Sequence, residues 1–243
     1  MSVRTRNGFT VALIGPDGAG KTTVARELES VLAGSVTYLY MGVNPDASNH
    51  LLPTTRIVHA LRRQRGGNSA ATDTATPRNH RASERPAVRK ALRTGRSFLR
   101  LGNRLAEEWH RALLASVHRR RGSIVVFDRH FFADYYAYDV RSPARRSVAR
   151  RLHGFFLSRL YPRPDLVIYL DAPADVLFAR KGEGTLESLE HRRREYLELG
   201  QILSEFVVVD ATRPLDAVVH EVADVITAFS ANRSHAEAAG ARR

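Results

Sequence analysis

The sequence feature that most limits the fold is the run IGPDGAGKTT at residues 14–23. Its segment from Gly15 to Thr22 fits the pattern G-x-x-x-x-G-K-[ST], in which backbone N–H groups of a glycine-rich loop surround phosphate oxygens. The run follows an apolar stretch with strand character and precedes a helical pattern, which is the context that this motif requires. The N-terminus of that helix adds positive potential at the phosphates. We therefore predict a phosphate-binding loop (P-loop) here.

Short apolar runs recur along the chain and predict the strands of a sheet. They lie at residues 9–14, 36–41, 123–127, 166–170 and 205–209. Apolar residues are nearly continuous within each run, as expected for parallel strands that are buried on both faces. Helical patterns fill the gaps between the runs. This alternation predicts an α/β fold with a doubly wound parallel sheet.

The positive charge of the chain is concentrated in one segment. The formal net charge of the 243 residues is +13, and residues 54–121 alone hold sixteen Arg and one Lys against four acidic residues. This segment therefore accounts for the whole excess. Its positive field favours an anionic partner, such as a phosphate-bearing metabolite, a nucleic acid, an anionic glycan or a lipid head group.

Composition excludes several other classes of protein. The chain has no cysteine, so it has no disulfide framework and no thiolate metal site or nucleophile. Its apolar runs are too short to span a bilayer, and no signal-peptide pattern opens the chain. With 43% hydrophobic residues the chain can form a full core. We predict a cytoplasmic protein with a single domain over residues 1–229.

Two stretches lack any apolar period. Residues 66–86, GGNSAATDTATPRNHRASERP, are polar and rich in small residues and proline, which predicts a mobile loop. Residues 230–243 are predicted to form a disordered tail.

The pattern of residues 86–118 predicts a basic helical insertion with two different faces. Trp109 and Leu113 belong to its apolar face, and Gly95 and Gly102 are expected to weaken the helix or divide it. The basic face is either exposed to solvent, or it meets a polyanion or positions an acidic acceptor. The arginines that fall within about one quadrant of this helix are Arg89, Arg93, Arg96, Arg100, Arg104 and Arg111.

The P-loop predicts ATP and Mg²⁺ as cofactors. In this motif the lysine, here Lys21, reaches the β- and γ-phosphates, and the hydroxyl of the next residue, Thr22, ligates Mg²⁺. The residues expected to bind the nucleotide here are Gly15, Gly18, Gly20, Lys21, Thr22 and Thr23.

A second pair of polar residues follows the third predicted strand. The stretch VVFDRH places Asp128 and Arg129 at the carboxyl end of a buried strand, where sheets of this kind bind ligands. A carboxylate there can hold Mg²⁺, and an adjacent guanidinium can bind an acceptor phosphate through two hydrogen bonds. The plainer alternative is a helix-capping aspartate beside an exposed arginine.

Several stretches, in this order and spacing, resemble thymidylate kinase, a family of P-loop nucleoside monophosphate kinases. They are GPDGAGKTT, the DR pair of VVFDRH, PDLVIYLDAPADVLFARK, LESLEHRRREYLEL and VVDATRP. The resemblance covers roughly residues 8–35 and 103–228. It implies a five-stranded parallel sheet in the order 2-3-1-4-5, a small lid over the phosphates, and transfer of the ATP γ-phosphoryl group to a nucleoside monophosphate such as dTMP. It also implies a possible homodimer.

The resemblance implies roles for individual residues. Asp17 faces the sugar hydroxyl of the acceptor, and the pair Asp128 and Arg129 serves Mg²⁺ and the acceptor phosphate. Arg180 matches the arginine at the entry of the lid. Arg193 aligns best with the arginine before YLEL, with its neighbours at 192 and 194 as alternatives, and an exposed charged helix face is the plainer interpretation of this run.

The resemblance also implies how the transferring phosphoryl group is neutralised. Residue 18 is glycine, so the P-loop supplies no arginine, and the lid must bring the cation through Arg180, Lys181 or Arg193. After the last strand, the backbone of Ala211 and Thr212 matches the loop that lies against adenine.

The acceptor side departs from the family pattern. The stretch YMGVNPDASNHLLPTTR replaces an Arg-Glu-Pro-Gly-type run, and Arg104 sits about one turn too early to replace the arginine that contacts the base. Three hypotheses therefore stay open. The first is a nucleoside monophosphate kinase, and the second is a kinase on the same scaffold that phosphorylates a sugar or an anionic glycan docked at the Arg-rich helix. The third is a nucleic-acid-binding P-loop ATPase, whose binding would depend steeply on salt.

Overall fold

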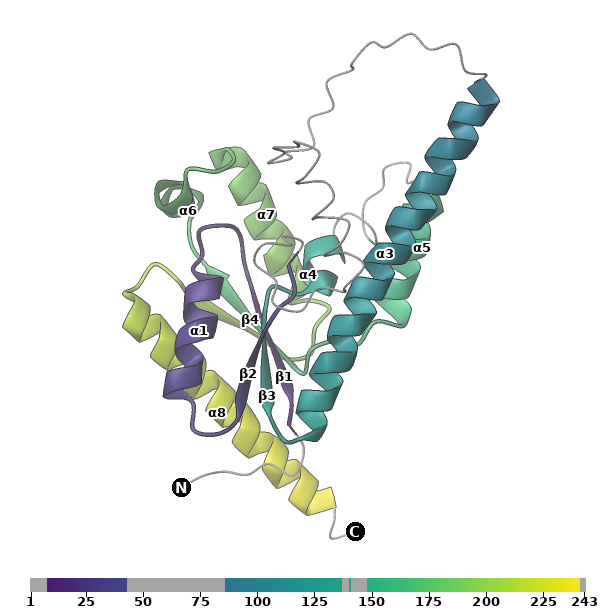
Figure 1. The fold of residues 1–243 in the computed structure, drawn as a ribbon. Coiled ribbons are helices and arrows are strands. Elements are labelled where there is room, and N and C mark those ends of the chain that lie inside the picture. The colour runs from purple at the N-terminus through teal and green to yellow at the C-terminus, as the bar shows by residue number, and fades with distance from the viewer. Residues whose placement is uncertain (1–7, 43–85, 137–139, 141–147, 241–243) are drawn as a thin grey trace, which may run out of the picture.

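The computed structural model describes residues 8–42, 86–136, 140 and 148–240. Its strands are β1 (Thr10–Ile14), β2 (Val36–Tyr40), β3 (Ile124–Asp128), β4 (Leu166–Asp171) and β5 (Phe206–Asp210). They form one parallel sheet in the order β2-β3-β1-β4-β5 (Figure 1). The predicted sheet and its strand order are confirmed, and each predicted strand matches the observed one to within a residue at either end.

Helices cover both faces of the sheet. Those in the described residues are α1 (Lys21–Val31), α3 (Pro86–Arg120), α4 (Phe131–Tyr135), α5 (Val148–Arg159), α6 (Ala174–Lys181), α7 (Leu186–Leu199) and α8 (Leu215–Gly240). Figure 1 shows α1 and α8 on one face and α3 with α5 on the other. In the described part of the chain, no helix combines the length and the apolar character that a membrane crossing requires.

Successive residues of each strand pack into two different cores. Val11 and Leu13 of β1 join the core beneath α1 and α8, whereas Ala12 and Ile14 join the core beneath α3 and α5. Side chains alternate between the two faces of a strand, so a sheet covered on both faces needs apolar residues at every position. This is why the strands are nearly continuous apolar runs in the sequence.

The helix α3 is slightly longer than the predicted residues 86–118, and part of its basic face is buried although that face could have been exposed to solvent. It forms 35 residues without a break, so Gly95 and Gly102 do not divide it. Arg111, on the basic face, is only 4% exposed, whereas Leu99 and Leu113, on the other face, are 75% and 63% exposed. The interpretation of a solvent-exposed basic face is therefore wrong at Arg111, where that face turns toward the protein.

The C-terminal helix α8 continues to Gly240, through residues for which the sequence predicted a disordered tail. The guanidinium of Arg233 donates to Asp165 at 2.9 Å, and the carboxylate of Asp165 also accepts from the backbone N–H and the hydroxyl of Thr10, both at 2.8 Å. These contacts tie the last turns of α8 to the start of β1. Residues 66–85 of the predicted mobile loop and residues 241–243 lie outside the described residues.

Candidate active site

The predicted site residues gather at one edge of the sheet. The P-loop follows β1, and β3, β4 and β5 end at Asp128, Asp171 and Asp210. Because the strands are parallel, their carboxyl ends meet at the same edge, which is where open α/β sheets bind ligands.

The P-loop adopts a backbone conformation that requires glycine. The φ angles of Gly15, Gly18 and Gly20 are 148°, 92° and 84°. A Cβ atom at Gly15 would lie 2.7 Å from the carbonyl oxygen of Leu170, and one at Gly18 would lie 2.7 Å from that of Leu177 in α6. Both contacts are too close for a side chain. Residue 18 is therefore glycine for a steric reason, and the loop has no room for an arginine there.

The lysine of the motif lies inside the loop. Lys21 is the first residue of α1 and is buried, and its ammonium donates to the carbonyl oxygens of Gly15 and Pro16 at 2.8 and 2.7 Å. Thr22 and Thr23 follow in the first turn of α1, at the helix N-terminus, whose positive potential favours phosphate. The arrangement fits the predicted nucleotide-binding role of these residues.

A buried carboxylate connects the P-loop to β3. Asp128 is fully buried, and its Oδ2 accepts hydrogen bonds from the hydroxyls of Thr22 at 2.6 Å and Tyr38 at 2.9 Å. Burial, together with the nearby Asp128, raises the pKa of Tyr38, so its hydroxyl remains a donor. No local pattern distinguishes Tyr38 from the other aromatic residues of the apolar runs, so its role was not predicted.

The group formed by Thr22 and Asp128 fits a magnesium ion. Mg²⁺ prefers hard oxygen ligands, and it is usually held by one or two protein groups together with water and substrate phosphates. Within the described residues, Oδ1 of Asp128 has no hydrogen-bond partner although it is buried. A hydroxyl and a carboxylate beside a P-loop supply the donor chemistry that such an ion needs.

The arginine of the DR pair lies against the P-loop. Arg129 has a φ of 70°, in the left-handed region that is uncommon for residues other than glycine. Its N–H donates to the carbonyl oxygen of Leu13 at 3.1 Å, and its guanidinium donates to Asp17 at 2.5 Å. Burial alone would raise the pKa of Asp17, but the cations Arg129 and Lys21 outweigh it and lower that pKa to about 2.

The helices α6 and α7 form a hairpin in the segment where the resemblance predicts the lid. We call residues 174–199 the lid hairpin. Gly182 and Gly184 connect its helices with φ angles of 66° and 81°, and Thr185 caps α7. Lys181, at the end of α6, reaches to 3.7 Å from Asp17 and to 3.0 Å from Glu183. One predicted lid cation is therefore close to the P-loop in this structure.

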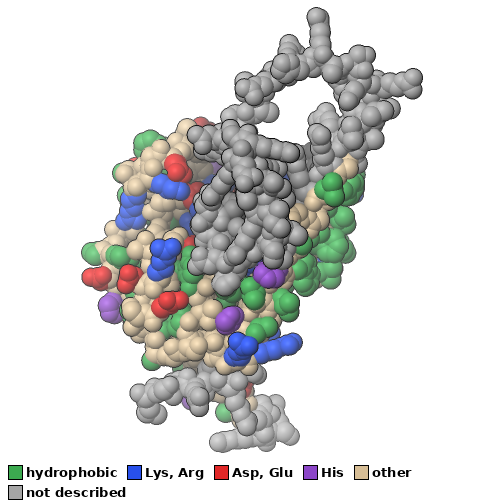
Figure 2. All heavy atoms as spheres, viewed as in Figure 1, with side chains coloured by type: hydrophobic (Ala, Val, Ile, Leu, Met, Phe, Trp, Pro, Cys, Tyr) green, Lys and Arg blue, Asp and Glu red, His purple; other side chains and the backbone are tan. Residues whose placement is uncertain are grey.

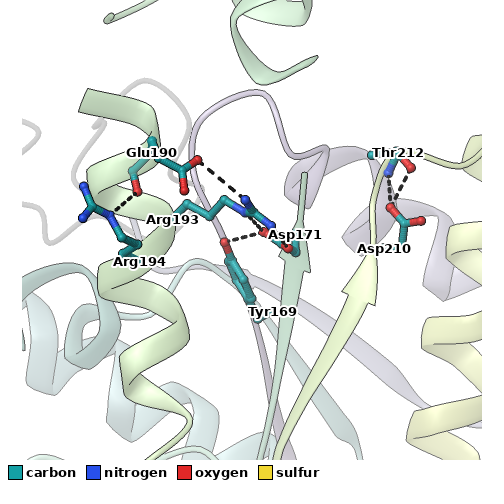
Figure 3. A network of polar contacts seen from close by, with 7 residues as sticks. All are labelled: Tyr169, Asp171, Glu190, Arg193, Arg194, Asp210 and Thr212. Atoms are coloured by element: carbon teal, nitrogen blue, oxygen red, sulfur yellow. Dashed lines mark hydrogen bonds and ion pairs between the residues drawn. The ribbon is translucent and has the colours of Figure 1, made fainter. Parts of the chain in front are cut away.

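The other two predicted lid cations contact the ends of β4 and β5. Arg180 donates to the carbonyl oxygen of Ala211 at 2.9 Å. Arg193 donates to both carboxylate oxygens of Asp171, at 2.7 and 2.8 Å (Figure 3). Of the alternatives to Arg193, Arg194 contacts the backbone carbonyl of Glu190 at 3.5 Å.

The loop after β5 lies beside these contacts. Ala211 is buried, and its N–H donates to the carbonyl oxygen of Asp171 at 2.7 Å. The backbone N–H and the hydroxyl of Thr212 donate to Asp210 at 2.9 and 2.7 Å (Figure 3). The predicted adenine-side loop is therefore fixed to the end of the sheet.

The helix α3 contributes Arg111, which the sequence analysis named only as one of six arginines on the basic face. Arg111 donates to the carbonyl oxygen of Gly42, just after β2, at 3.0 Å and lies 5.3 Å over the ring of Phe131. Arg104, from the same helix face, lies 4.7 Å over the ring of Tyr135. Helical spacing placed both arginines on one face, but it could not tell which face turns inward.

The candidate residues thus form two neighbouring groups. The first joins the P-loop, the DR pair and Lys181, and the second joins the lid arginines to the ends of β4 and β5. Asp171 belongs to the second group and was not predicted, although it ends a strand in the same way as Asp128.

Comparison with known proteins relates part of the chain to thymidylate kinases. The chain is 28% identical over 120 residues to the thymidylate kinase of Thermosipho africanus, and the matched stretch covers 45% of this chain and 57% of that protein. It is 34% identical over 115 residues to the probable thymidylate kinase of Archaeoglobus fulgidus, or 44% of this chain and 55% of that protein. The chain spans about half the length of these curated relatives. No model of a known protein family matches it. The matches show a thymidylate kinase-like relationship.

Exchanging Arg129 for asparagine is expected to raise the pKa of Asp17 above about 2. The substitution removes the strongest cation beside Asp17, while asparagine tolerates the left-handed backbone. The pKa can be followed by NMR titration of the aspartate carboxyl carbons. Arg180→Asn is the control, because Arg180 contacts Ala211 instead. An unchanged pKa of Asp17 in Arg129→Asn would contradict the pairing.

Proposed function

We propose that this protein is a Mg²⁺-dependent phosphotransferase of the thymidylate kinase type, which transfers the γ-phosphoryl group of ATP to a nucleoside monophosphate such as dTMP. The observation that carries the proposal is the direct contact of Thr22 with Asp128 at 2.6 Å, beside a P-loop whose Asp17 is paired with Arg129. The similarity to a thymidylate kinase and to a probable thymidylate kinase supports the same chemistry.

Each group has a role that follows from its position. Phosphoryl transfer depends mainly on positioning and on neutralising the charge of the phosphoryl oxygens. The P-loop N–H groups and Lys21 would hold the ATP phosphates. Thr22 and Asp128 would hold Mg²⁺, which would neutralise phosphate charge. Arg129, which donates to Asp17 beside the P-loop, would turn its guanidinium to an acceptor phosphate.

The lid hairpin would complete the site. Arg180, Lys181 and Arg193 are its predicted cations, and closure of such a lid also excludes water from the transferring group. Lys181 is the cation nearest to the P-loop, at 3.7 Å from Asp17. Asp17 itself would anchor a hydroxyl of the acceptor.

A second candidate acceptor is a sugar or an anionic glycan. The observation that favours it is the burial of Arg111, on the basic face of α3, against the end of β2. Arg104 on that face is exposed, and four further arginines precede it in the sequence at helical spacing. The third hypothesis, a nucleic-acid-binding ATPase, rests on the same basic segment.

We also propose that two copies of the chain associate, as the resemblance implies, and that α3 and α5 form the contact between them. Figure 2 shows hydrophobic side chains gathered along the side of the molecule where α3 lies. Exposed apolar side chains that gather in one patch mark interaction surfaces. The small residues Gly102 and Ala106 lie between the exposed ones, so two helices related by a two-fold axis could approach closely. The large exposed residues are Phe98, Leu99, Trp109 and Leu113 of α3 and Val148, Leu152 and Phe155 of α5.

Lys21→Ala is expected to lower kcat/KM for ATP turnover by at least about 100-fold while the fold is retained, because it removes the ammonium from the phosphate site. ADP formation measures activity, and circular dichroism measures the fold. Arg159→Ala, at an exposed position of α5, is the control and should keep its activity. Full activity of Lys21→Ala would refute a P-loop mechanism for every acceptor.

A panel of acceptors distinguishes the hypotheses. With ATP and Mg²⁺, we expect dTMP to be phosphorylated at enzyme-like rates, because the relatives that the chain matches are a thymidylate kinase and a probable thymidylate kinase. If ADP forms with anionic glycans as acceptors but with none of the nucleotide acceptors, the second hypothesis is favoured instead. Fluorescence anisotropy with short oligonucleotides over a salt series addresses the ATPase hypothesis, which predicts a steep loss of binding as salt rises.

The proposed assembly predicts a mass of two chains in sedimentation equilibrium and a shift to one chain in Leu113→Arg. A charge at this exposed position would be buried unpaired between the two copies. Val31→Arg, at an exposed apolar position of α1, is the matched control and should leave the mass unchanged. A wild-type protein of single-chain mass at micromolar concentration would contradict the assembly.

A further inference from the structure

The end of β4 holds an arginine of the lid hairpin in a defined orientation. Figure 3 shows the guanidinium of Arg193, from α7, facing the carboxylate of Asp171. Nε donates to one carboxylate oxygen at 2.7 Å and Nη2 donates to the other at 2.8 Å. A pair of parallel hydrogen bonds fixes both the position and the plane of a guanidinium, which a single bond would leave able to rotate.

Asp171 is itself held in place by a buried tyrosine. The hydroxyl of Tyr169 donates to Oδ1 of Asp171 at 2.9 Å, and the Tyr169 ring is fully buried. That ring stacks on Tyr196 of α7, with centroids 5.7 Å apart and an interplanar angle of 25°. Tyr196 lies one turn after Arg193. The end of β4 therefore contacts α7 twice, through the stacking of Tyr169 on Tyr196 and through the pairing of Asp171 with Arg193.

The pairing uses only one edge of the guanidinium. Nε and Nη2 face Asp171, while Nη1 lies 3.6 Å from Glu190 on the same helix. Hydrogen bonds with Arg193 are the main cause of the lowered pKa of Asp171, so the partner remains a carboxylate. An arginine has five N–H donors, and the donors on the outer edge stay available to a phosphate oxygen.

The ion pair is not the main means by which α7 docks on the sheet. Leu189, Tyr196 and Leu199 of α7 are buried in the two cores. This apolar packing also holds the helix against the sheet, apart from the ion pair. Docking of the helix therefore does not explain why Arg193 and Asp171 form two parallel hydrogen bonds.

We propose that Asp171 is a positioning residue, which orients Arg193 so that the outer edge of its guanidinium meets the phosphoryl group in transfer. This inference rests on the proposed function. Catalytic arginines need orientation to within a fraction of an ångström, and a misplacement of about 1 Å can cost about 100-fold in rate. Asp171 acts only through Arg193 and touches no substrate.

A double-mutant cycle tests the inference. Asp171→Asn should lower kcat roughly 10- to 100-fold with little change in the KM for ATP, because orientation rather than binding is lost. Arg193→Ala should lower kcat at least as much. In the double variant the Asp171→Asn step should have no further effect. Independent, multiplying effects of the two substitutions on kcat would overturn the proposal.

Guanidinium rescue and a matched substitution sharpen the result. Added guanidinium ion should restore part of the activity of Arg193→Ala while Asp171 is present, and none in the double variant. Asp224→Asn, the same substitution at an exposed position of α8, should leave kcat unchanged. All variants should keep the melting temperature of the wild type within a few degrees. Equal rescue with and without Asp171 would contradict the positioning role.

A measurement that does not depend on turnover separates this inference from the proposed function. With a non-hydrolysable ATP analogue and Mg²⁺, the Nε–H resonance of Arg193 should stay sharp and slow to exchange in the wild type and broaden in Asp171→Asn. A wild type that turns over with no acceptor would refute the proposed function, yet this resonance would still report on the pairing. A resonance that is the same in both proteins would refute the inference.

Discussion

The buried carboxylate of Asp128 is the group on which the rest of the site depends. A buried charge is costly unless it is paired or hydrogen-bonded, and here the hydroxyls of Thr22 and Tyr38 satisfy one of its oxygens. These bonds connect three parts of the chain, because Thr22 lies in the first turn of α1, Tyr38 lies in β2 and Asp128 ends β3. The P-loop and the edge of the sheet are therefore held together by side chains as well as by the strand ladder.

The sequence predicted those features that depend on local pattern. The strands are apolar at every position because both faces of the sheet are covered, so their limits were predictable to within a residue. The P-loop and the DR pair were recognisable because their residues are neighbours in the sequence. Tyr38 and Asp171 were missed because their roles arise from side chains that meet across strands or between a strand and a helix, which no local pattern records.

Periodicity gave the two faces of α3 but not their orientation. Both an exposed basic face and a buried one fit the same spacing. In the structure Arg111 of this face is buried and donates to Gly42, Arg104 of the same face is exposed, and Leu113 is exposed too. The end of α8 illustrates a related limit. Its polar, alanine-rich sequence resembles a frayed tail, but the contact of Arg233 with Asp165, 68 positions away, ties it to the sheet.

The lack of space for a side chain at Gly18 limits which segments can bring a cation to the P-loop. A side chain at this position would collide with the backbone of α6, so the P-loop cannot carry its own arginine. The same close approach brings α6 to the loop, and with it Lys181, which reaches toward Asp17. The close approach of α6 to Gly18 therefore leaves no room for an arginine at position 18, and it also brings Lys181 of the lid hairpin to the P-loop. Arg180 and Arg193, in contrast, are attached to the ends of β5 and β4, so any charge that they contribute depends on how those strand ends hold them.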